Sequence, residues 1–169
     1  LKKQKDKLQA AQQEIRKLSS GVKQSPTAII FTDAHGKMEY VNPRFEEITG
    51  YSSHDVIGKD LRQFQCDAQW KEKDYQELWE WISQGREWRG TIQNRRKDGT
   101  LYWERVIISS IRDAGQNPTN FLVIKEDISQ QKQKENEIRY LKEFNEGIVN
   151  TMSQGILVED ADGHIIFVN

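Results

Sequence analysis

The chain has 169 residues, enough for one domain with flanking segments but too few for two complete domains of ordinary size. Hydrophobic residues make up 36% and charged residues 30%, and the net charge of −1 gives no whole-chain electrostatic reason to expect nucleic-acid binding. The single cysteine excludes a disulfide framework and a multi-cysteine metal site within one chain. No stretch approaches the ~20 apolar residues of a membrane span. We therefore expect a cytoplasmic piece of a longer polypeptide, without direct membrane contact.

Residues 1–23 are predicted to form a charged helix with one apolar stripe. The stripe follows a 3, 4, 3, 4 spacing through Leu8, Ala11, Ile15, Leu18 and Val22. This heptad pattern predicts a two-stranded coiled coil and hence a homodimer held through Leu8, Ile15 and Leu18. The alternative is a single amphipathic helix that lies on its own domain.

The next segment predicts two strands and a helix. An apolar strand over 27–32 and a second strand over 37–41 are joined by a turn in which Gly36 suits a positive φ. Asn42 is placed to cap a helix that begins at Pro43, and Gly50 ends it.

A longer helix and three strands complete the predicted domain. The helix, over 70–84, has an apolar stripe of Tyr75, Leu78, Trp79 and Ile82. The strands cover 87–97, 100–112 and about 119–126, and Asp98-Gly99 predicts a two-residue hairpin between the first two. The order of elements indicates an α+β domain over residues 24–127 with a mostly antiparallel sheet.

An internal repeat lies beyond a polar linker helix, which we place at residues 128–150. Shifting residues 29–42 forward by 127 places them on residues 156–169 without gaps, and Asp33, Gly36 and Val41 recur as Asp160, Gly163 and Val168. Residues 151–169 therefore read as the truncated start of a second copy of the domain.

Several blocks in this order resemble a PAS domain with its C-terminal PAC portion. They are residues 32–42, 45–51, 58–59, 88–90, 94–100 and 126–129. The resemblance covers roughly residues 20–130. It implies a five-stranded antiparallel sheet with helices on one face, able to enclose a ligand pocket, and flanked by N- and C-terminal signalling helices.

PAS domains are sensory or dimerisation modules, found mostly in histidine kinases, cyclic-di-GMP enzymes, transcription regulators and chemoreceptors. The resemblance therefore implies a sensory input module of a larger bacterial signalling protein, which passes a ligand or redox state to an output domain. Asp127 and Ile128 match the family's junction with the exit helix, where Asp127 would cap the helix and Ile128 would pack on the sheet. A plain helix cap without a signalling role is the alternative at this junction, and a cofactor-free dimerisation spacer is the alternative for the whole domain.

A redox-active flavin is the cofactor with which the residues of the predicted pocket are compatible. Trp88, Ile92 and Asn94 share one face of a strand by alternation, so an inward orientation would offer an apolar wall and a buried amide to a flavin. Asn42, Trp88 and Asn94 resemble positions of FAD-binding PAS domains, as does the stretch that contains Trp79. The open alternatives are that Trp88 fills the core, that Asn42 only caps a helix, and that the pocket holds a small metabolite or nothing.

Other chemistry finds little support. His35, His54 and His164 fall in turns or a loop and not in the helix that carries the haem ligand of haem-binding PAS domains, which argues against haem. Leu61 stands where blue-light flavin domains have the reactive cysteine, and Cys66 is expected to be a small packed side chain.

No phosphate-binding loop, paired metal ligands or catalytic Ser/His/Asp set is present, so we predict no metal and no enzyme activity. The basic residues 95–97 indicate an exposed turn and not a nucleic-acid site.

Overall fold

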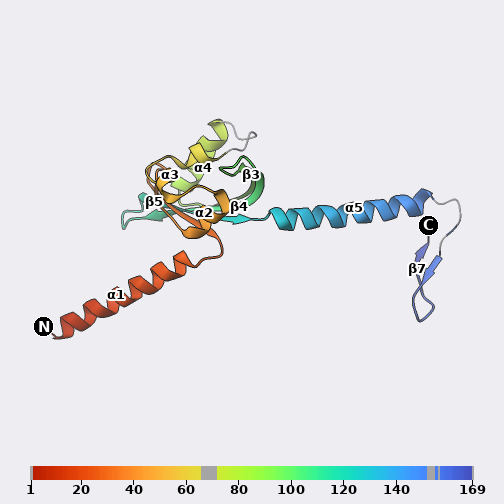
Figure 1. Ribbon diagram of the computed structural model, residues 1–169, viewed down its shortest axis with the longest axis horizontal. Coiled ribbons are helices and arrows are strands. Elements are labelled where there is room, and N and C mark those ends of the chain that lie inside the picture. The colour runs from red at the N-terminus through yellow and green to blue at the C-terminus, as the bar shows by residue number, and fades with distance from the viewer. Residues whose placement is uncertain (1, 66–71, 152–154, 156, 169) are drawn as a thin grey trace. The chain divides into compact units, whose positions relative to one another are not determined.

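The computed structural model describes residues 2–65, 72–151, 155 and 157–168. A five-stranded sheet with helices against it follows the helix α1 (Lys2–Lys23) and precedes the helix α5 (Ser129–Thr151) (Figure 1). The chain divides into two compact units, Leu1–Ser129 and Gln130–Asn169. The second unit contains a small hairpin of β6 (Leu157–Glu159) and β7 (Ile165–Val168).

The central sheet is antiparallel throughout and has the order β2-β1-β5-β4-β3. Its strands are β1 (Ala28–Asp33), β2 (Met38–Val41), β3 (Trp88–Arg95), β4 (Leu101–Arg112) and β5 (Pro118–Asp127). The expected α+β architecture, with a five-stranded antiparallel sheet, is confirmed. Strand β5 is the central strand of the sheet, because it pairs with β1 on one side and with β4 on the other. Strands β4 and β5 are the two longest strands.

Four helical segments cover the inner face of the sheet. They are α2 (Pro43–Thr49), α3 (Ser53–Val56), the 3-10 helix η1 (Leu61–Phe64) and α4 (Glu72–Ser83). The buried core includes Ile30, Phe45, Val56, Ile82, Val106, Ile108 and Val123. The sequence predicted no residue ranges for α3 and η1, because both are too short for a periodic pattern, and His54 lies in α3 and not in a loop.

Asn42 connects the end of α1 to the domain. Its side-chain oxygen accepts hydrogen bonds from the backbone N–H groups of Ile29 (2.8 Å) and Phe45 (3.1 Å). Its amide nitrogen donates to the carbonyl oxygens of Val22 (3.1 Å) and Thr27 (3.0 Å). Asn42 is fully buried, so these four bonds satisfy an amide that would otherwise be costly to bury. The predicted cap of α2 is confirmed, and the same side chain also holds the chain that enters the sheet.

The hairpins share one turn geometry, and it differs from the two-residue turn expected at Asp98-Gly99. The N–H of Arg96 bonds to the Thr100 carbonyl and the N–H of Gly99 bonds back to Arg96, which leaves a three-residue loop with Gly99 at φ 90°. Such loops require a left-handed residue at the third position, which glycine supplies at the lowest cost. The β4–β5 turn has the same bonds with Gln116, at φ 66°, in that position.

The repeat predicted from the sequence has the same backbone pairing in both copies. In β1–β2 the pairs are Ile30 with Val41, Phe31 with Tyr40 and Thr32 with Met38, and in β6–β7 the corresponding residues 127 positions later pair in the same way. Both hairpins carry an irregularity in register at the same place. Ile156 and Asn169, the ends of the predicted repeat, lie outside the described residues.

Candidate functional site

A cavity of about 510 Å³ lies between α4 and the inner face of the sheet. Ile108 of β4 and Phe121 and Val123 of β5 form its floor, and Leu78 and Trp79 of α4 form its roof. The volume falls within the range of about 300–1,000 Å³ that is usual for small-molecule sites. The cavity also explains why the apolar stripe of α4 is incompletely buried. Ile82 packs into the core, whereas Trp79 keeps 37% of its surface exposed.

Two aromatic rings meet at the cavity. The ring centroids of Trp79 and Phe121 are 4.7 Å apart, with an interplanar angle of 53°. The Trp79 ring also lies close to Gly36, where an added Cβ would come within 3.4 Å of it. The cavity therefore presents a large apolar surface from Trp79, supported from below by the buried Phe121.

The polar groups around the cavity come from the β1–β2 turn, from η1 and the residues that flank it, and from α4. Asp60 caps η1 and accepts a hydrogen bond from the Arg62 backbone, while the Arg62 guanidinium binds both Asp60 oxygens at 2.6–3.1 Å. These bonds from Arg62 outweigh burial and lower the pKa of Asp60, so the two opposite charges compensate each other. Gln65, Gln76 and the exposed His35 add further polar groups to the lining.

Only Trp79 of the five predicted cofactor residues is among the described residues that line the cavity. Ile92 is buried in the apolar core. Trp88 is half-buried, and its ring covers Gly90 so closely that an added Cβ there would lie 2.2 Å from the ring. The space that Gly90 leaves is thus filled by the Trp88 side chain.

Asn94 belongs to a group of four buried polar side chains, Asn94, Tyr102, Glu104 and Lys125, which we call the buried polar cluster. The Glu104 carboxylate, with no exposed surface, accepts from Lys125 Nζ at 2.7 Å and from the Tyr102 hydroxyl at 2.7 Å. Asn94 donates to the same carboxylate at 3.0 Å and to the carbonyl oxygen of Phe64 at 3.3 Å. Burial, followed by the Glu104 charge, raises the pKa of Tyr102 and keeps it a hydrogen-bond donor.

These contacts decide how well the predicted residues fit a flavin. The uracil-like edge of a flavin needs donors and acceptors, and the buried amide of Asn94 was expected to supply them. Asn42 was expected at the flavin site from the resemblance to FAD-binding PAS domains. Both amides instead bond to the protein itself, Asn42 to backbone groups and Asn94 to Glu104 and Phe64. The five residues therefore do not converge on one flavin site, and Trp79 is the member of the set that a molecule in the cavity would meet.

The junction between β5 and α5 contains the two predicted relay residues. Asp127 Oδ1 accepts from the Ser129 N–H at 2.9 Å, as a helix cap does, and Asp127 Oδ2 accepts from Arg96 at 2.6 Å. Burial raises the pKa of Asp127, but the hydrogen bonds from Ser129 and Arg96 outweigh it and hold this pKa below the ordinary value of 3.8. Ile128 is buried and donates its N–H to the Trp103 carbonyl at 2.9 Å, which ties the start of the helix to β4.

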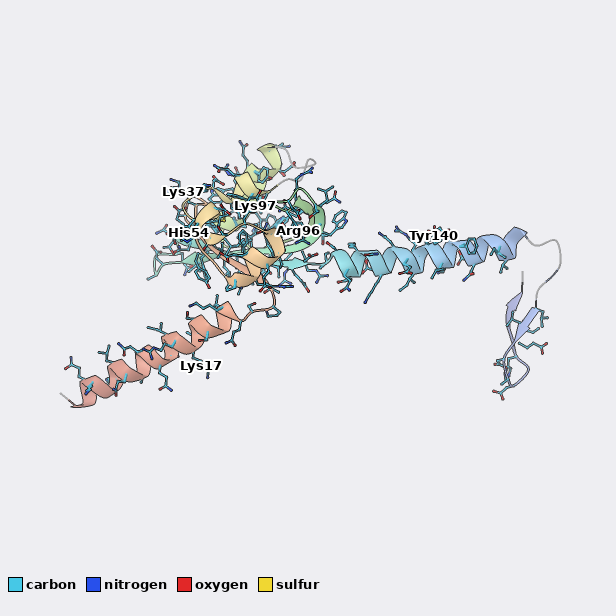
Figure 2. The ribbon with its side chains drawn as sticks, in the orientation of Figure 1. Lys17, Lys37, His54, Arg96, Lys97 and Tyr140 are labelled. Atoms are coloured by element: carbon cyan, nitrogen blue, oxygen red, sulfur yellow. The ribbon has the colours of Figure 1, made fainter. Side chains whose placement is uncertain are left out.

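Arg96 joins this junction to the buried polar cluster. Its guanidinium lies 4.3 Å from the centroid of the Tyr102 ring and also donates to the Ile48 carbonyl at the end of α2. The neighbouring Lys97 pairs with Asp55 at 2.7 Å, and Figure 2 labels Arg96 and Lys97 on the sheet domain. Two of the three basic residues at 95–97 are thus held in internal ion pairs.

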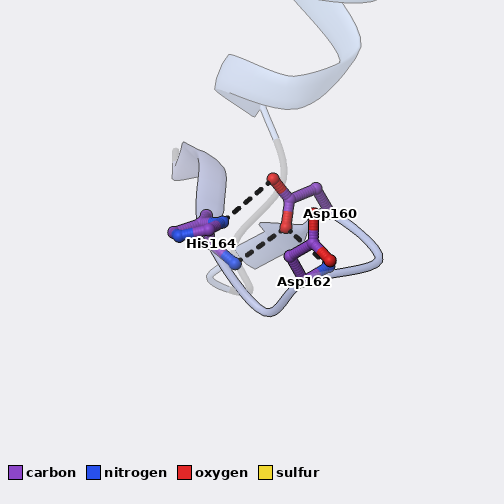
Figure 3. A group of neighbouring side chains, drawn as sticks. All are labelled: Asp160, Asp162 and His164. Atoms are coloured by element: carbon purple, nitrogen blue, oxygen red, sulfur yellow. Dashed lines mark hydrogen bonds and ion pairs between the residues drawn. The ribbon is translucent and has the colours of Figure 1, made fainter.

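The exposed side chains of Asp160, Asp162 and His164 gather in the β6–β7 turn, and their ligand-type atoms lie within 4.8 Å of one another (Figure 3). Asp160 Oδ1 accepts from the N–H groups of Asp162 and His164, each at 2.9 Å. Asp33 makes the same pair of bonds in the β1–β2 turn, where Lys37 stands in place of His164. The hairpin turn itself therefore accounts for this grouping. Cys66 lies outside the described residues.

The comparisons with known proteins agree with this fold. A family model described as a PAS domain matches residues 26–130, and the chain belongs to the PAS domain family. It is 29% identical over 148 residues to a nitrogen fixation regulatory protein of Klebsiella oxytoca, covering 88% of this chain and 30% of that protein. It is 30% identical over 129 residues to the bacterioopsin transcriptional activator of Halobacterium salinarum, covering 75% of this chain and 19% of the relative.

Solved structures show the same architecture. The PAS domain of an HTR-like protein from Haloarcula marismortui superposes with a TM-score of 0.62 at 25% identity, over 73% of this chain and 99% of that one. The chain spans about 30% of the length of the Klebsiella relative. Within the described residues, no helix is both long and apolar enough to cross a bilayer.

The buried ion pair gives a test of the polar cluster. Lys125→Met should lower the free energy of unfolding by about 3–5 kcal/mol, because it leaves the Glu104 charge buried without its partner. Glu104→Gln combined with Lys125→Met should recover more than half of that loss, since glutamine keeps hydrogen bonds to Tyr102 and Asn94 without a charge. Urea unfolding followed by circular dichroism measures all three proteins.

The matched control is Lys73→Met, which removes the lysine of the exposed Lys73–Glu77 pair and should change stability by no more than about 0.5 kcal/mol. A double variant as unstable as Lys125→Met alone would contradict the assignment of the loss to an unpaired buried charge.

Proposed function

We propose that this chain is a sensory input module in which a small, largely apolar ligand occupies the cavity beneath α4 and changes how β5 holds the exit helix α5. The observation that carries the proposal is the course of β5. Phe121 and Val123 form part of the cavity floor, Lys125 belongs to the buried polar cluster, and Asp127 caps α5. A ligand that shifts the inner face of this strand would act on a continuous, closely packed element.

The ligand we propose is flat and aromatic, because Trp79 offers a broad apolar ring surface that Phe121 supports. A flavin such as FAD, expected from the resemblance to FAD-binding PAS domains, is the first candidate, held against Trp79 and not by Asn42 or Asn94. A small apolar metabolite in the same place is the second. In either case the module would act as a sensor.

The ligand proposal predicts a specific effect of Trp79. Freshly purified protein should carry the bound molecule, seen as flavin absorption for FAD or as a released metabolite in mass spectrometry. Trp79→Ala should weaken retention about tenfold, because a buried aromatic contact contributes on the order of 1 kcal/mol beyond the apolar area that it covers.

Trp81→Ala is the matched control for Trp79→Ala. Trp81 lies on the same helix and is 46% exposed, but it does not line the cavity, so this variant should retain the ligand as the parent does. Equal retention by all three proteins, or the release of no molecule from any of them, would count against a ligand in this cavity.

The relay through Asp127 predicts a local effect at α5. Asp127→Asn removes the charged acceptor of Arg96 and weakens the cap on Ser129, so amide hydrogen exchange in the first turn of α5 should accelerate about five- to tenfold. Glu126→Gln is the control, because the neighbouring Glu126 forms an exposed pair with Arg105 and caps nothing. Equal exchange rates in the two variants would contradict a relay through Asp127.

The protection of the α5 amides by Asp127 should depend on pH, and the parent and Asp127→Asn proteins measure this dependence. The folded pKa of Asp127 is lowered, so its stabilising contribution is complete above the ordinary pKa of 3.8 and is lost as the pH falls through the lower folded value. The difference in α5 protection between the parent and Asp127→Asn should therefore be constant above about pH 5 and shrink at more acidic pH.

A dimerisation spacer is the second candidate function, and α1 supports it. Leu8, Ile15 and Leu18 are 61–66% exposed on one stripe of that helix, as the proposed homodimer contact requires. The outer face of the sheet adds a cross-strand row of half-buried isoleucines, Ile29, Ile124 and Ile107. Retained dimerisation in a protein that binds no ligand would favour the spacer over the sensor.

A further inference from the structure

Arg112, the last residue of β4, ties the C-terminal end of α4 to the sheet. Its Nη2 donates to the carbonyl oxygen of Ser83, the last residue of α4, at 2.6 Å. Nη1 of the same guanidinium donates to the Gln116 carbonyl at 2.9 Å, and Nε donates to Ser110 Oγ at 3.3 Å. One planar group therefore joins the helix that roofs the cavity, the β4–β5 turn and strand β4.

The bond to Ser83 pairs a carbonyl at the end of a helix. The last carbonyls of an α-helix have no partner within the helix, and they lie at its negative end. A guanidinium supplies a hydrogen-bond donor and a positive charge there, and such charge-assisted bonds are stronger than bonds between neutral groups. Arg112 is half-buried, so water competes less for this bond than for an exposed ion pair.

Gly85 leaves the space in which the guanidinium lies. It follows the end of α4 with φ 84°, a left-handed conformation that favours glycine. A Cβ added at Gly85 would lie 2.7 Å from the Arg112 guanidinium, so the arginine occupies the space that a side chain would need. The chain that leaves α4 is thus packed directly against the group that holds the helix.

The anchored end of α4 also carries residues that cover the cavity. Ile82, which lines the cavity, immediately precedes Ser83, and Trp79 lies one turn earlier on the same side of the helix. On the sheet, Ile108 of the cavity floor and Arg112 stand four residues apart, at inward positions of β4. The bond between Arg112 and Ser83 therefore connects the strand of the cavity floor with the helix of its roof.

From these contacts we infer that Arg112 is a positioning residue for the cavity. It fixes the distance between α4 and the sheet, and with it the place of the Trp79 ring beside Phe121, although Arg112 is not among the described residues that line the cavity. Loss of its bonds lets the end of α4 move away from the sheet, which opens the cavity and weakens the binding of a flat apolar ligand. The effect on a ligand rests on the proposed function, whereas the position of α4 is tested with no ligand present.

Thiol labelling of the full chain measures how readily the cavity opens. In a Cys66→Ser background, Val123→Cys places a thiol at the buried cavity floor, and Val106→Cys places one in the buried core away from the cavity lining. Arg112→Met removes the guanidinium and keeps an aliphatic side chain. It should speed the labelling of Val123→Cys by a small aromatic disulfide at least about tenfold, because hydrogen bonds to charged groups contribute more than neutral ones. Labelling of Val106→Cys, which needs a wider opening of the domain, should change by less than about threefold.

Two results of the labelling would overturn the inference. Equal acceleration at both positions would mean that Arg112 stabilises the whole domain and not the roof of the cavity. Unchanged labelling of Val123→Cys would mean that α4 keeps its place without Arg112. The matched control is Arg105→Met, because Arg105 lies on the same strand in an exposed pair with Glu126, and both labelling rates should stay within about twofold of the parent.

A glycine substitution tests the same contact without changing Arg112. Gly85→Ala places a methyl group where the guanidinium lies, so it should also speed the labelling of Val123→Cys, by at least about fivefold. Gly99→Ala is the control, since Gly99 has a similar φ of 90° but an added Cβ there meets nothing within 4 Å. Equal effects of the two alanines would assign the change to backbone strain and exclude the contact with Arg112 as its cause.

Binding of the neutral fluorescent aromatic N-phenyl-1-naphthylamine tests the consequence for a ligand. Arg112→Met should weaken its affinity about three- to tenfold in the parent protein but less than about twofold in a Trp79→Ala background, because Arg112 acts through the position of Trp79. Equal weakening in both backgrounds would contradict an action through Trp79. A parent protein that binds no probe would contradict the proposed ligand site, whereas the labelling rates decide the position of α4 by themselves.

Discussion

A carboxylate buried beneath a sheet must be neutralised and hydrogen-bonded, and Glu104 imposes this constraint on the domain. The charge has no exposed surface, and its partners come from three adjacent strands: Asn94 of β3, Tyr102 of β4 and Lys125 of β5. Removal of any one partner would leave polar atoms without compensation in a medium of low dielectric constant. The inner face at this end of the sheet is therefore filled by the protein's own polar groups, in a fixed arrangement.

The other end of the same face is organised differently. Ile108, Phe121 and Val123 present apolar surface to a cavity, and α4 covers it without filling it. Strand β5 passes from this cavity through the buried polar cluster to the cap of α5, and Arg96 connects the cluster to that cap by its contacts with Tyr102 and Asp127. A tight polar region between a cavity and a helix junction is an arrangement through which a small displacement can be transmitted, because closely packed groups resist continuous deformation.

Much of the fold could be predicted from the sequence because the relevant signals are local. Alternation in β4, the glycine turns and the cap at Asn42 each depend on a few neighbouring residues. The candidate site was less accessible, because Asn42 and Asn94 look the same in sequence whether they face a ligand or the protein. Their partners, such as the Val22 carbonyl and Glu104, come from distant positions that only the folded chain brings together.

The sequence contains one signal for the buried polar cluster. Tyr102, Glu104, Val106 and Ile108 alternate along β4, so the strand that buries Val106 and Ile108 must also bury Glu104. The same reasoning places Lys125 beneath the sheet beside Phe121 and Val123. An inward glutamate and an inward lysine on predicted neighbouring strands would have suggested an ion pair, and hence that Asn94 has a protein partner.

The most direct test of coupling between the cavity and α5 is hydrogen exchange of the α5 amides in a protein whose cavity is partly filled by its own side chain. Ile108→Phe enlarges a residue of the cavity floor, and Ile111→Phe makes the same change at an exposed position of the same strand. The account predicts altered exchange in residues 129–135 for Ile108→Phe and parental exchange for Ile111→Phe. Parental exchange in both proteins, with the cavity of Ile108→Phe shown to be smaller, would contradict it.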